Sequence, residues 1–399
     1  MDAGNRKNIA ILTFALVVVM LGYGMVIPLF PFYIERLGAG GSQLGLLISV
    51  SALLELLFGP IWGSVSDRVG RKPILLLGLL GYALSSLLFG LSTELWMLFV
   101  SRALSGVLSS ATTATALAYI SDNTSERDRG GGMGMLGAAM GLGLILGPAA
   151  GGWLGGSSLA LPFFIAAGSS LLALVLAALW LPESLPAEVR QRAGRVRTVD
   201  LGALWRALFG PVGLLMFLLF LVSFGLTNFE SIFGLYAAQE LDYGPERVGT
   251  ILAVVGLVST LGKAILIGPL TKRWGEEPII KVSLAASAAG FVVLLLATTY
   301  PGVLLATGVF ILSKTLLRTV IIALASKRAT TGQGATMGLS NSFMSLGRIV
   351  GPLWAGFIFD INAAYPYLSG ASIMFIGFLI SLVWVSQDSS REVLMTKPH

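Results

Sequence analysis

Seven charged residues lie inside long apolar stretches of this chain, and they are the groups best suited to chemistry. Two are carboxylates and five are cations: Glu55, Glu230, Arg102, Lys263, Lys314, Arg318 and Arg348. A charge near the centre of a bilayer costs at least about 2.5–3.5 kcal/mol, so such residues usually serve a function. A medium of low dielectric constant raises the pKa of a carboxylate, and a nearby Arg lowers it again. A carboxylate that moves between two such surroundings can therefore bind and release a proton.

The stretches that hold these charges are long enough to cross a membrane. A helix needs about 20 apolar residues to span about 30 Å of hydrocarbon, and the chain contains twelve such stretches. The predicted spans are residues 8–34, 42–66, 73–92, 94–120, 130–156, 158–182, 212–238, 246–270, 278–299, 301–326, 333–360 and 362–386. The first is too long for a signal-peptide core and lacks a cleavage site, so we expect it to be retained. The chain is predicted to be an all-α polytopic membrane protein.

The composition agrees with a membrane protein and excludes several kinds of site. Hydrophobic residues make up 55% of the chain and charged residues only 12%, against about 25% in soluble domains. There is no Cys, and the one His is His399, which removes thiolate nucleophiles, disulfides and His/Cys zinc sites. We therefore predict no metal site and no membrane-embedded hydrolase, because no span supplies a His or Cys as base or nucleophile.

The distribution of basic residues predicts an orientation. Lys and Arg outside the spans gather in alternate loops, whereas the loops between them carry only Arg36 and Arg247. Cytoplasmic loops are enriched in Lys and Arg, so both termini and the long central loop are predicted to be cytoplasmic. The same distribution accounts for the net charge of +6 without a nucleic-acid partner.

The two halves of the chain repeat one another. Asp67–Pro73 aligns with Lys272–Pro278, and Gly147–Gly151 aligns with Gly351–Gly356 at nearly the same offset. Six spans per half give two repeats of the same orientation, as in transporters that bind their substrate between parallel repeats.

This repeat divides the chain into two pseudo-symmetric six-helix bundles. The predicted domains are 1–182, a cytoplasmic linker at 183–210, and 211–399 with its cytoplasmic tail. Within the linker, apolar residues at helical spacing in Val199–Phe209 predict a short amphipathic helix on the membrane surface.

Three motifs resemble signature sequences of the major facilitator superfamily. They are Gly63–Pro73 (GSVSDRVGRKP) between spans two and three, Arg102–Gly106 (RALSG) in span four and Gly143–Gly152 (GLILGPAAGG) in span five. The third is similar to the motif of the twelve-helix drug:proton antiporter branch. Short stretches in spans seven and eleven, Asn228–Glu230 and Asn341–Pro352, resemble multidrug exporters of Gram-positive bacteria. The resemblance covers nearly the whole chain.

The resemblance implies that the first motif is a conformational latch, formed by Gly63, Asp67, Arg68, Gly70 and Arg71. Asp67 lies at the cytoplasmic C-terminus of its helix, where the helix dipole disfavours an anion. Either the adjacent basic residues compensate this charge, or Asp67 faces another helix N-terminus across the seam between the halves and closes the cytoplasmic side, as the resemblance implies.

Span five carries glycines that share one helix face. Gly143, Gly147 and Gly151 recur at every fourth residue, and small residues let membrane helices approach closely. Pro148 favours a bend at the same place. The face is predicted to be a rigid packing seam or a hinge between conformations, and the sequence leaves both open.

Glu230 is the first candidate for a proton carrier, because it lies in span seven and matches the position that the resemblance implies. Glu55 is the second candidate, and Arg102 is predicted to modulate the pKa of these carboxylates. The alternatives are permanent Glu–Arg pairs that hold helices together, a place for Glu55 at the seam between the halves, and backbone capping by Arg102.

Aromatic and basic groups are predicted to line a substrate cavity: Tyr23, Phe229, Phe233, Tyr236, Lys314 and Arg318. Lys263 is expected to snorkel toward the cytoplasmic surface. Related exporters often carry a second carboxylate in span ten, where this chain has Thr315. Positive charges therefore outnumber negative ones, which favours anionic or zwitterionic amphiphiles, including lipid head groups, over lipophilic cations.

These features predict a secondary transporter of the inner (plasma) membrane that exports amphipathic small molecules by alternating access, coupled to protons. The alternatives are a lipid or glycolipid translocase and a proton-coupled nutrient importer. The chain lacks a G-x-x-x-x-G-K-[ST] motif, which argues against a built-in ATP motor. We expect a non-enzymatic monomer without a cofactor, with the proton gradient as its energy source. Its expected partners are an amphipathic small-molecule or lipid substrate and the bilayer, without nucleic acid.

Overall fold

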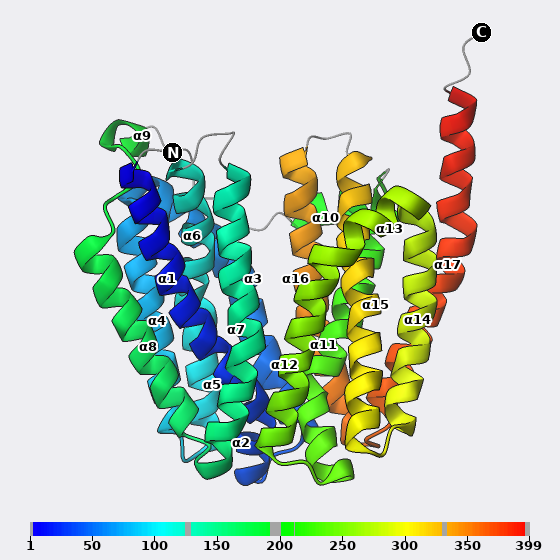
Figure 1. Cartoon of the computed structure of the whole chain (residues 1–399), viewed down its shortest axis with the longest axis horizontal. Helices are drawn as coiled ribbons and strands as arrows, with labels where there is room; N and C mark the ends of the chain where they lie inside the picture. Colours follow the sequence, from blue (N-terminus) through cyan, green and yellow to red (C-terminus); the bar gives the residue numbers. More distant parts are fainter. Residues whose placement is uncertain (1–2, 124–128, 192–200, 211, 329–332, 396–399) are drawn as a thin grey trace. The chain divides into compact units, whose positions relative to one another are not determined.

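Helices account for all the regular structure that the computed structural model describes. It covers residues 3–123, 129–191, 201–210, 212–328 and 333–395, and no strand occurs in these ranges (Figure 1). Twelve of its helical runs are long and apolar enough to cross a membrane. The predicted fold class, an all-α membrane protein with twelve spanning helices, is therefore confirmed.

The observed spans agree with the predicted ones to within a few residues at most ends. They are Ile11–Arg36, Gly41–Val69, Arg71–Gly90, Leu95–Asn123, Gly137–Ser157, Leu161–Trp180, Gly213–Leu241, Pro245–Trp274, Glu276–Leu296, Tyr300–Lys327, Thr336–Phe359 and Tyr365–Leu382. The last helix continues to Met395, beyond the predicted end at residue 386. The segment after Gly377 contains no Gly or Pro before that point, so nothing in it stops a helix.

Contacts divide the chain into two compact units, of which the first comprises Met1–Asp200 and Gly234–Leu257. Its helices are α1 (Ala3–Val26), η1 (Ile27–Leu29), α2 (Phe30–Arg36), α3 (Gly41–Val69), α4 (Arg71–Gly90), α5 (Leu95–Leu104), η2 (Ser105–Ser109), α6 (Ser110–Asn123), α7 (Arg129–Ser157), α8 (Leu161–Trp180) and α9 (Ala187–Gln191), together with the end of α11 (Gly213–Leu241) and most of α12 (Pro245–Leu261). Inside this unit α1 packs against α7 and α8, and α4 packs against α6 and α8.

The second unit comprises Leu201–Phe233 and Val258–His399. Its helices are α10 (Leu201–Leu208), most of α11 (Gly213–Leu241), the end of α12 (Pro245–Leu261), η3 (Gly262–Leu266), α13 (Ile267–Trp274), α14 (Glu276–Leu296), α15 (Tyr300–Lys327), α16 (Gln333–Phe359) and α17 (Tyr365–Met395). Here α14 packs against α15 and α17. The division at the 183–210 linker stays a prediction, since the contact-defined units place Gly234–Leu257 with the first unit.

A short helix lies within the predicted amphipathic segment of the linker. It is α10, which packs against α16 and buries Leu204. Trp205 and Phe209 are 67% and 73% exposed, with ring centroids 5.2 Å apart. One face of α10 is therefore packed and the other presents aromatic rings, as a helix at a membrane surface would.

Two glycines turn the chain sharply at equivalent places in the two repeats. Gly70 separates α3 from α4 with φ +118°, and Gly275 separates α13 from α14 with φ +75°. Side chains other than hydrogen rarely adopt these conformations. The aligned loops 67–73 and 272–278 thus share a turn that requires glycine.

Two spans contain a π-helical turn. Ser105–Ser109 separates α5 from α6, and Gly262–Leu266 separates α12 from α13. Such turns are rare, widen the helix locally and often occur at functional sites. Hydropathy shows no trace of them, because the apolar run continues on both sides.

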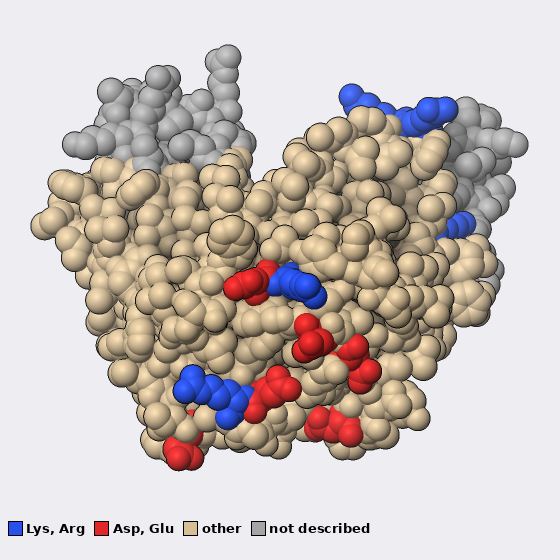
Figure 2. Space-filling model, turned by 60° about the horizontal axis from the view of Figure 1, so that its bottom comes forward, with Lys and Arg blue, Asp and Glu red and all other residues tan. Residues whose placement is uncertain are grey.

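Figure 2 shows one face, on which Asp, Glu, Lys and Arg side chains occupy a few patches in an otherwise uncharged surface. Large apolar side chains such as Trp153, Leu296 and Leu305 are more than 70% exposed. Soluble proteins rarely expose apolar surface this extensively, whereas lipid solvates it.

Candidate functional site

The intramembrane carboxylate of the second unit is Glu230, and it is exposed although it lies well inside an apolar span. It belongs to α11, the span with the largest share of its apolar window buried, 72%. Its helical neighbours Asn228, Phe229 and Ser231 are buried. The Glu230 side chain therefore reaches open space from an otherwise packed helix.

Three cations act electrostatically on the Glu230 carboxylate. They are Arg348 on α16, and Arg318 and Lys314 on α15. The side chains of Arg318 and Arg348 are exposed, as is that of Lys263, which interacts with Arg318. The structure thus brings Glu230 together with Lys314 and Arg318 as predicted site residues, and it adds Arg348. Positive charges outnumber the single carboxylate in this group.

Lys314 differs from the two arginines because it is buried. Its side chain is 2% exposed, with Nζ 3.3 Å from Met374 Sδ and 5.1 and 5.3 Å from the ring centroids of Phe291 and Phe310. Aromatic faces attract a cation, so these rings stabilise the ammonium group in the core of the unit. A Cβ at Gly225 would collide with Lys314 Nζ, which explains the glycine there.

The predicted cavity aromatics take two different places. Phe229 and Phe233 are each 1% exposed and contact each other with ring centroids 4.9 Å apart; Phe229 also meets Phe310 at 5.1 Å. Tyr236 is buried as well, whereas Tyr23 is 37% exposed. Phe229, Phe233 and Tyr236 therefore belong to packed cores in this structure, and their role in lining a cavity stays a prediction.

Arg102 and Glu55 form the charged group of the first unit. The Arg102 guanidinium lies 4.5 Å from the centroid of the Phe30 ring and interacts electrostatically with Tyr23, Tyr82 and Glu55. Its Nε is buried and has no hydrogen-bond partner among the described residues. The structure therefore brings Arg102 and Glu55 near each other in the first unit, as the prediction of a modulating arginine requires.

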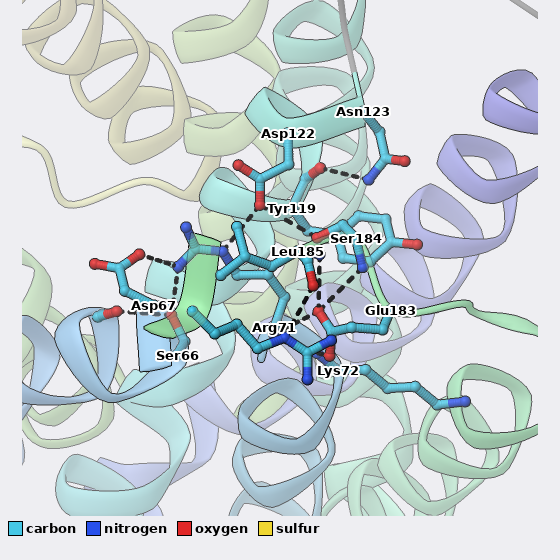
Figure 3. Close-up of polar contacts among 12 residues, drawn as sticks. Ser66, Asp67, Arg71, Lys72, Tyr119, Asp122, Asn123, Glu183, Ser184 and Leu185 are labelled. Atoms are coloured by element: carbon cyan, nitrogen blue, oxygen red, sulfur yellow. Dashed lines mark hydrogen bonds and ion pairs between the residues drawn. The ribbon is translucent and has the colours of Figure 1, made fainter. Parts of the chain in front are cut away.

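Two of the predicted latch residues, Asp67 and Arg71, lie in a polar cluster where α3 ends and α4 begins (Figure 3). Arg71 pairs with Asp67 at 2.6 Å and with Asp122 at 3.0 Å, and it donates a hydrogen bond of 2.6 Å to Ser66 Oγ. A basic neighbour, Arg71, therefore compensates the charge of Asp67 at the helix C-terminus. Arg68 is exposed and no atom lies near a Cβ built on Gly63. The latch itself stays a prediction.

Glu183 caps the start of α4 in the same cluster. Its Oε1 accepts the backbone N–H of Arg71 at 2.8 Å, and its Oε2 accepts that of Lys72 at 3.1 Å. Negative charge is stabilised at a helix N-terminus. A Cβ at Gly70 would lie 2.9 Å from Glu183 Cδ, so Gly70 also makes room for this cap. The first residue of the predicted linker is therefore fixed to α4.

The second unit contains an ion pair that corresponds to Arg71–Asp122, with the two charges exchanged. Glu276 at the start of α14 pairs with Lys327 at the end of α15, and Glu277 pairs with Arg328 at 3.1 Å. In the repeat alignment Glu276 corresponds to Arg71 and Lys327 to Asp122. The sequence reasoning missed Asp122 and Glu183. Extending the repeat offset from residue 71 to residue 122 would have revealed the exchanged pair.

The glycine face of α7 packs against α1. A Cβ at Gly147 would lie 2.6 Å from Gly24 Cα, and one at Gly151 would lie 2.6 Å from Met25 Cα. Gly143 is equally close to the backbone of the same helix. These contacts are those of a packing seam inside the first unit, and a hinge there stays a prediction.

A second, unpredicted seam lies on another face of α7. A Cβ at Gly152 would lie 2.9 Å from Gly249 Cα on α12, and the Pro148 carbonyl closes on Gly249. The α12 residues concerned belong to the same compact unit. Glycine on both faces therefore lets α7 contact two helices at backbone distance.

The sequence is similar to bacterial drug-resistance proteins over almost its whole length. A family model described as Major Facilitator Superfamily matches residues 12–334 and 215–396. The chain is 32% identical to multidrug resistance protein 2 of Bacillus subtilis (strain 168), over 94% of this chain and 95% of that one. It is 28% identical to the quinolone resistance protein NorA of Staphylococcus aureus (strain COL), over 95% and 96%.

Solved structures of transporters share this fold. The human organic anion transporter MFSD10 superposes with a TM-score of 0.69 at 22% identity, covering 96% of this chain and all of that one. The nucleoside transporter NupG gives a TM-score of 0.76 at 15% identity, covering 95% and 97%. Identities this low carry the architecture alone.

Proposed function

The chain belongs to the Major Facilitator Superfamily, and we propose that it is a multidrug exporter that expels amphipathic small molecules in exchange for protons. The observation that carries the proposal is Glu230, an exposed carboxylate deep in an apolar span, under the influence of three cations. The relatives reported above are named for multidrug or quinolone resistance. They give no support to lipid translocation or nutrient uptake.

Proton exchange follows if a proton and the substrate compete for Glu230. A proton neutralises the carboxylate and removes its attraction for a positively charged substrate group. By linkage, a substrate that binds the ionised carboxylate favours proton release to the same extent. When the binding site opens alternately to the two sides of the membrane, the substrate moves out and the proton moves in. Energy comes from the proton gradient, without a cofactor.

Three cations, Arg318, Arg348 and Lys314, surround the single carboxylate of Glu230. This excess of positive charge determines which charged groups a substrate can carry. A carboxylate on the substrate would be attracted by the exposed guanidinium groups of Arg318 and Arg348, which suit planar carboxylates. An ammonium group on the same molecule would be attracted by Glu230 and would compete with the proton. A purely anionic molecule would bind better with Glu230 protonated, which couples in the wrong direction for exchange. We therefore propose zwitterionic amphiphiles as the preferred cargo.

The remaining residues are assigned supporting roles in this proposal. Glu55 and Arg102 form a second candidate group for proton coupling in the first unit. The cluster around Asp67 and Arg71 is proposed to stabilise one conformation of the cycle, and α7 to accommodate the change between conformations. The chain is a multi-pass membrane protein, and we propose that its termini are cytoplasmic and that it acts as a monomer.

Transport by the purified chain in proteoliposomes tests the proposal. A quinolone carrying both a carboxylate and an amine, its methyl ester and a lipophilic cationic dye form a matched panel. We expect accumulation driven by an imposed pH gradient, abolished by a protonophore, with the free quinolone preferred over its ester. Accumulation that ignores the gradient would reject proton coupling, and a preference for the dye would reject the inferred substrate class.

A further inference from the structure

A small polar cavity lies in the first unit, between α3 and the π-helical turn η2. Its volume is about 70 Å³, and it is lined by Ser51, Glu55, Ser105, Gly106, Ser109, Ser110 and Thr113. Every lining residue except Gly106 ends in oxygen. Polar groups inside apolar spans cost free energy unless they have bonding partners, so this partly open, oxygen-lined pocket calls for a polar partner.

The local sequence creates this cavity. A Cβ at Gly106 would lie 2.6 Å from the backbone oxygen of Ser51 and 2.8 Å from Leu54 Cβ, so only glycine lets η2 approach α3 this closely. The π-helical turn shifts backbone carbonyls out of the regular helical pattern. One of them, that of Val107, accepts hydrogen bonds from Trp62 Nε1 at 2.6 Å and Ser110 Oγ at 2.9 Å.

The donor set has the chemistry of a hard-cation site. One carboxylate and five hydroxyl groups offer only oxygen, the ligand type that alkali and alkaline-earth cations prefer. The single carboxylate, Glu55, also interacts with Arg102, so a bound cation would compete with the guanidinium for it. The volume exceeds the about 10–15 Å³ that a single water needs on this measure, so it has room for a small ion with a water ligand.

One further observation indicates that the cavity needs an occupant. The Ser109 Oγ is buried and has no hydrogen-bond partner among the described residues, and buried hydroxyls are nearly always bonded. Glu55 also interacts with Arg102, whose guanidinium lies over Phe30. A cation beside Glu55 would weaken the attraction between Glu55 and Arg102. Binding in the cavity would therefore change the electrostatics of this charged pair.

We propose that this cavity is a sodium site, in which the Glu55 carboxylate supplies the counter-charge and the hydroxyl groups of Ser51, Ser109 and Thr113 supply further oxygen ligands. In other transporters, unwound backbone carbonyls of discontinuous membrane helices coordinate Na⁺, and η2 is a comparable irregular turn in a span of this chain. The site is separate from Glu230, which lies in the other compact unit, and the inference does not rest on the proposed export of drugs.

Trp62 provides a built-in reporter, since its indole N–H bonds to the turn that lines the cavity. The full chain in detergent is titrated with NaCl against choline chloride at constant pH and ionic strength. Intrinsic Trp fluorescence, to which all eight Trp residues contribute, and binding of radioactive ²²Na⁺ are both recorded. We expect a saturable fluorescence change, absent in Trp62→Phe, and saturable ²²Na⁺ binding that unlabelled Na⁺ displaces and choline does not.

Matched variants decide whether the cavity is responsible. Glu55→Gln is expected to abolish ²²Na⁺ binding, and Ser109→Ala to weaken it about tenfold, because each removes an oxygen ligand or its charge. Glu94→Gln and Ser157→Ala, at exposed positions, serve as controls and should bind as the wild type does. Na⁺ should also raise the melting temperature of the wild type but not that of Glu55→Gln. If Glu55→Gln does not fold, Glu55→Asp replaces it.

Three results would overturn the sodium site. The first is the absence of saturable ²²Na⁺ binding, and the second is unchanged binding in Glu55→Gln or in both Glu55→Asp and Ser109→Ala. The third is a Trp62 signal that follows pH in sodium-free buffer and ignores Na⁺, which would assign the cavity to water and a proton. Export driven by a pH gradient in sodium-free medium tests the proposed function separately, and its outcome leaves this test unaffected.

Discussion

Glu230 shares the second unit with Arg318, Arg348 and Lys314, so one carboxylate is set against several cations. The exposed arginines can meet a ligand, whereas Lys314 is enclosed by Met374 and two phenyl rings. The buried lysine is therefore out of reach of a ligand, and ligand contact falls to the arginines.

Substitution of Arg318 tests this assignment. Arg318→Met keeps much of the side-chain volume and removes the guanidinium, so the preference for a zwitterionic quinolone over its methyl ester should fall about tenfold, since a hydrogen bond to a charged group contributes about 1.5–3 kcal/mol. The measurement is the ratio of initial transport rates in proteoliposomes. Arg273→Met, at an exposed site, is the control. An unchanged ratio in Arg318→Met would show that the carboxylate binds elsewhere.

The sequence showed which residues are unusual for a membrane span, but it did not show what each of them contacts. The sequence identified Glu230, Arg102 and Arg318 because charges in apolar spans are conspicuous. It could not predict that Phe229 and Phe233 are buried in a core, since a residue that faces lipid, core or cavity in a membrane protein is equally apolar. The position of Lys314 depends on ring contacts with α14, which no local pattern encodes.

At the scale of elements, an ion pair joins the start of one span to the end of the next in each unit, with opposite polarity. Arg71 and Asp122 join α4 to α6 in the first, and Glu276 and Lys327 join α14 to α15 in the second. The aligned positions have kept the attraction while exchanging the charges. The pair therefore fixes the ends of the helices, whichever residue supplies each sign.

A charge exchange tests this role. Arg71→Glu alone adds a third carboxylate beside Asp67 and Asp122 at a partly buried site, and it should destabilise the protein by about 3 kcal/mol or more. Arg71→Glu combined with Asp122→Lys should recover part of the loss, though not the contacts of Arg71 with Asp67 and Ser66. The melting temperature in detergent measures both. A double variant as unstable as the single one would contradict the exchanged-pair account.

Substitution in α7 distinguishes a seam from a hinge. Gly147→Ala forces a methyl group to within 2.6 Å of Gly24 Cα, and overpacking of this kind costs about 1–3 kcal/mol. Gly137→Ala, where nothing lies within 4 Å, is the control on the same helix. We expect Gly147→Ala to lower both the melting temperature and the transport rate. A lower rate at unchanged melting temperature would instead favour a hinge.

Spans were predictable because about twenty apolar residues give a strong local signal. The features that the sequence missed depend on distant partners. The π-helical turn at Ser105–Ser109 forms where Gly106 meets α3, and the Glu183 cap forms where the linker returns to α4. Neither contact leaves a periodic pattern.

At the scale of the whole molecule, membrane orientation is open to a direct test because the chain has no Cys. Single-cysteine variants at exposed loop ends, Ser158→Cys and Asp360→Cys, should react with a membrane-impermeant maleimide in intact cells. Arg273→Cys should react only after the membrane is permeabilised, since basic loops stay in the cytoplasm. Labelling in the reverse order would invert the predicted topology.

The central claim is that Glu230 couples transport to protons. The most direct test measures substrate exchange at equilibrium separately from substrate accumulation driven by a pH gradient. In proteoliposomes Glu230→Gln should still exchange labelled for unlabelled substrate at equilibrium, at a reduced rate because the ammonium loses its counter-charge, yet it should not accumulate substrate when a pH gradient is imposed. Glu94→Gln should do both. Gradient-driven accumulation by Glu230→Gln at the wild-type level would contradict the account.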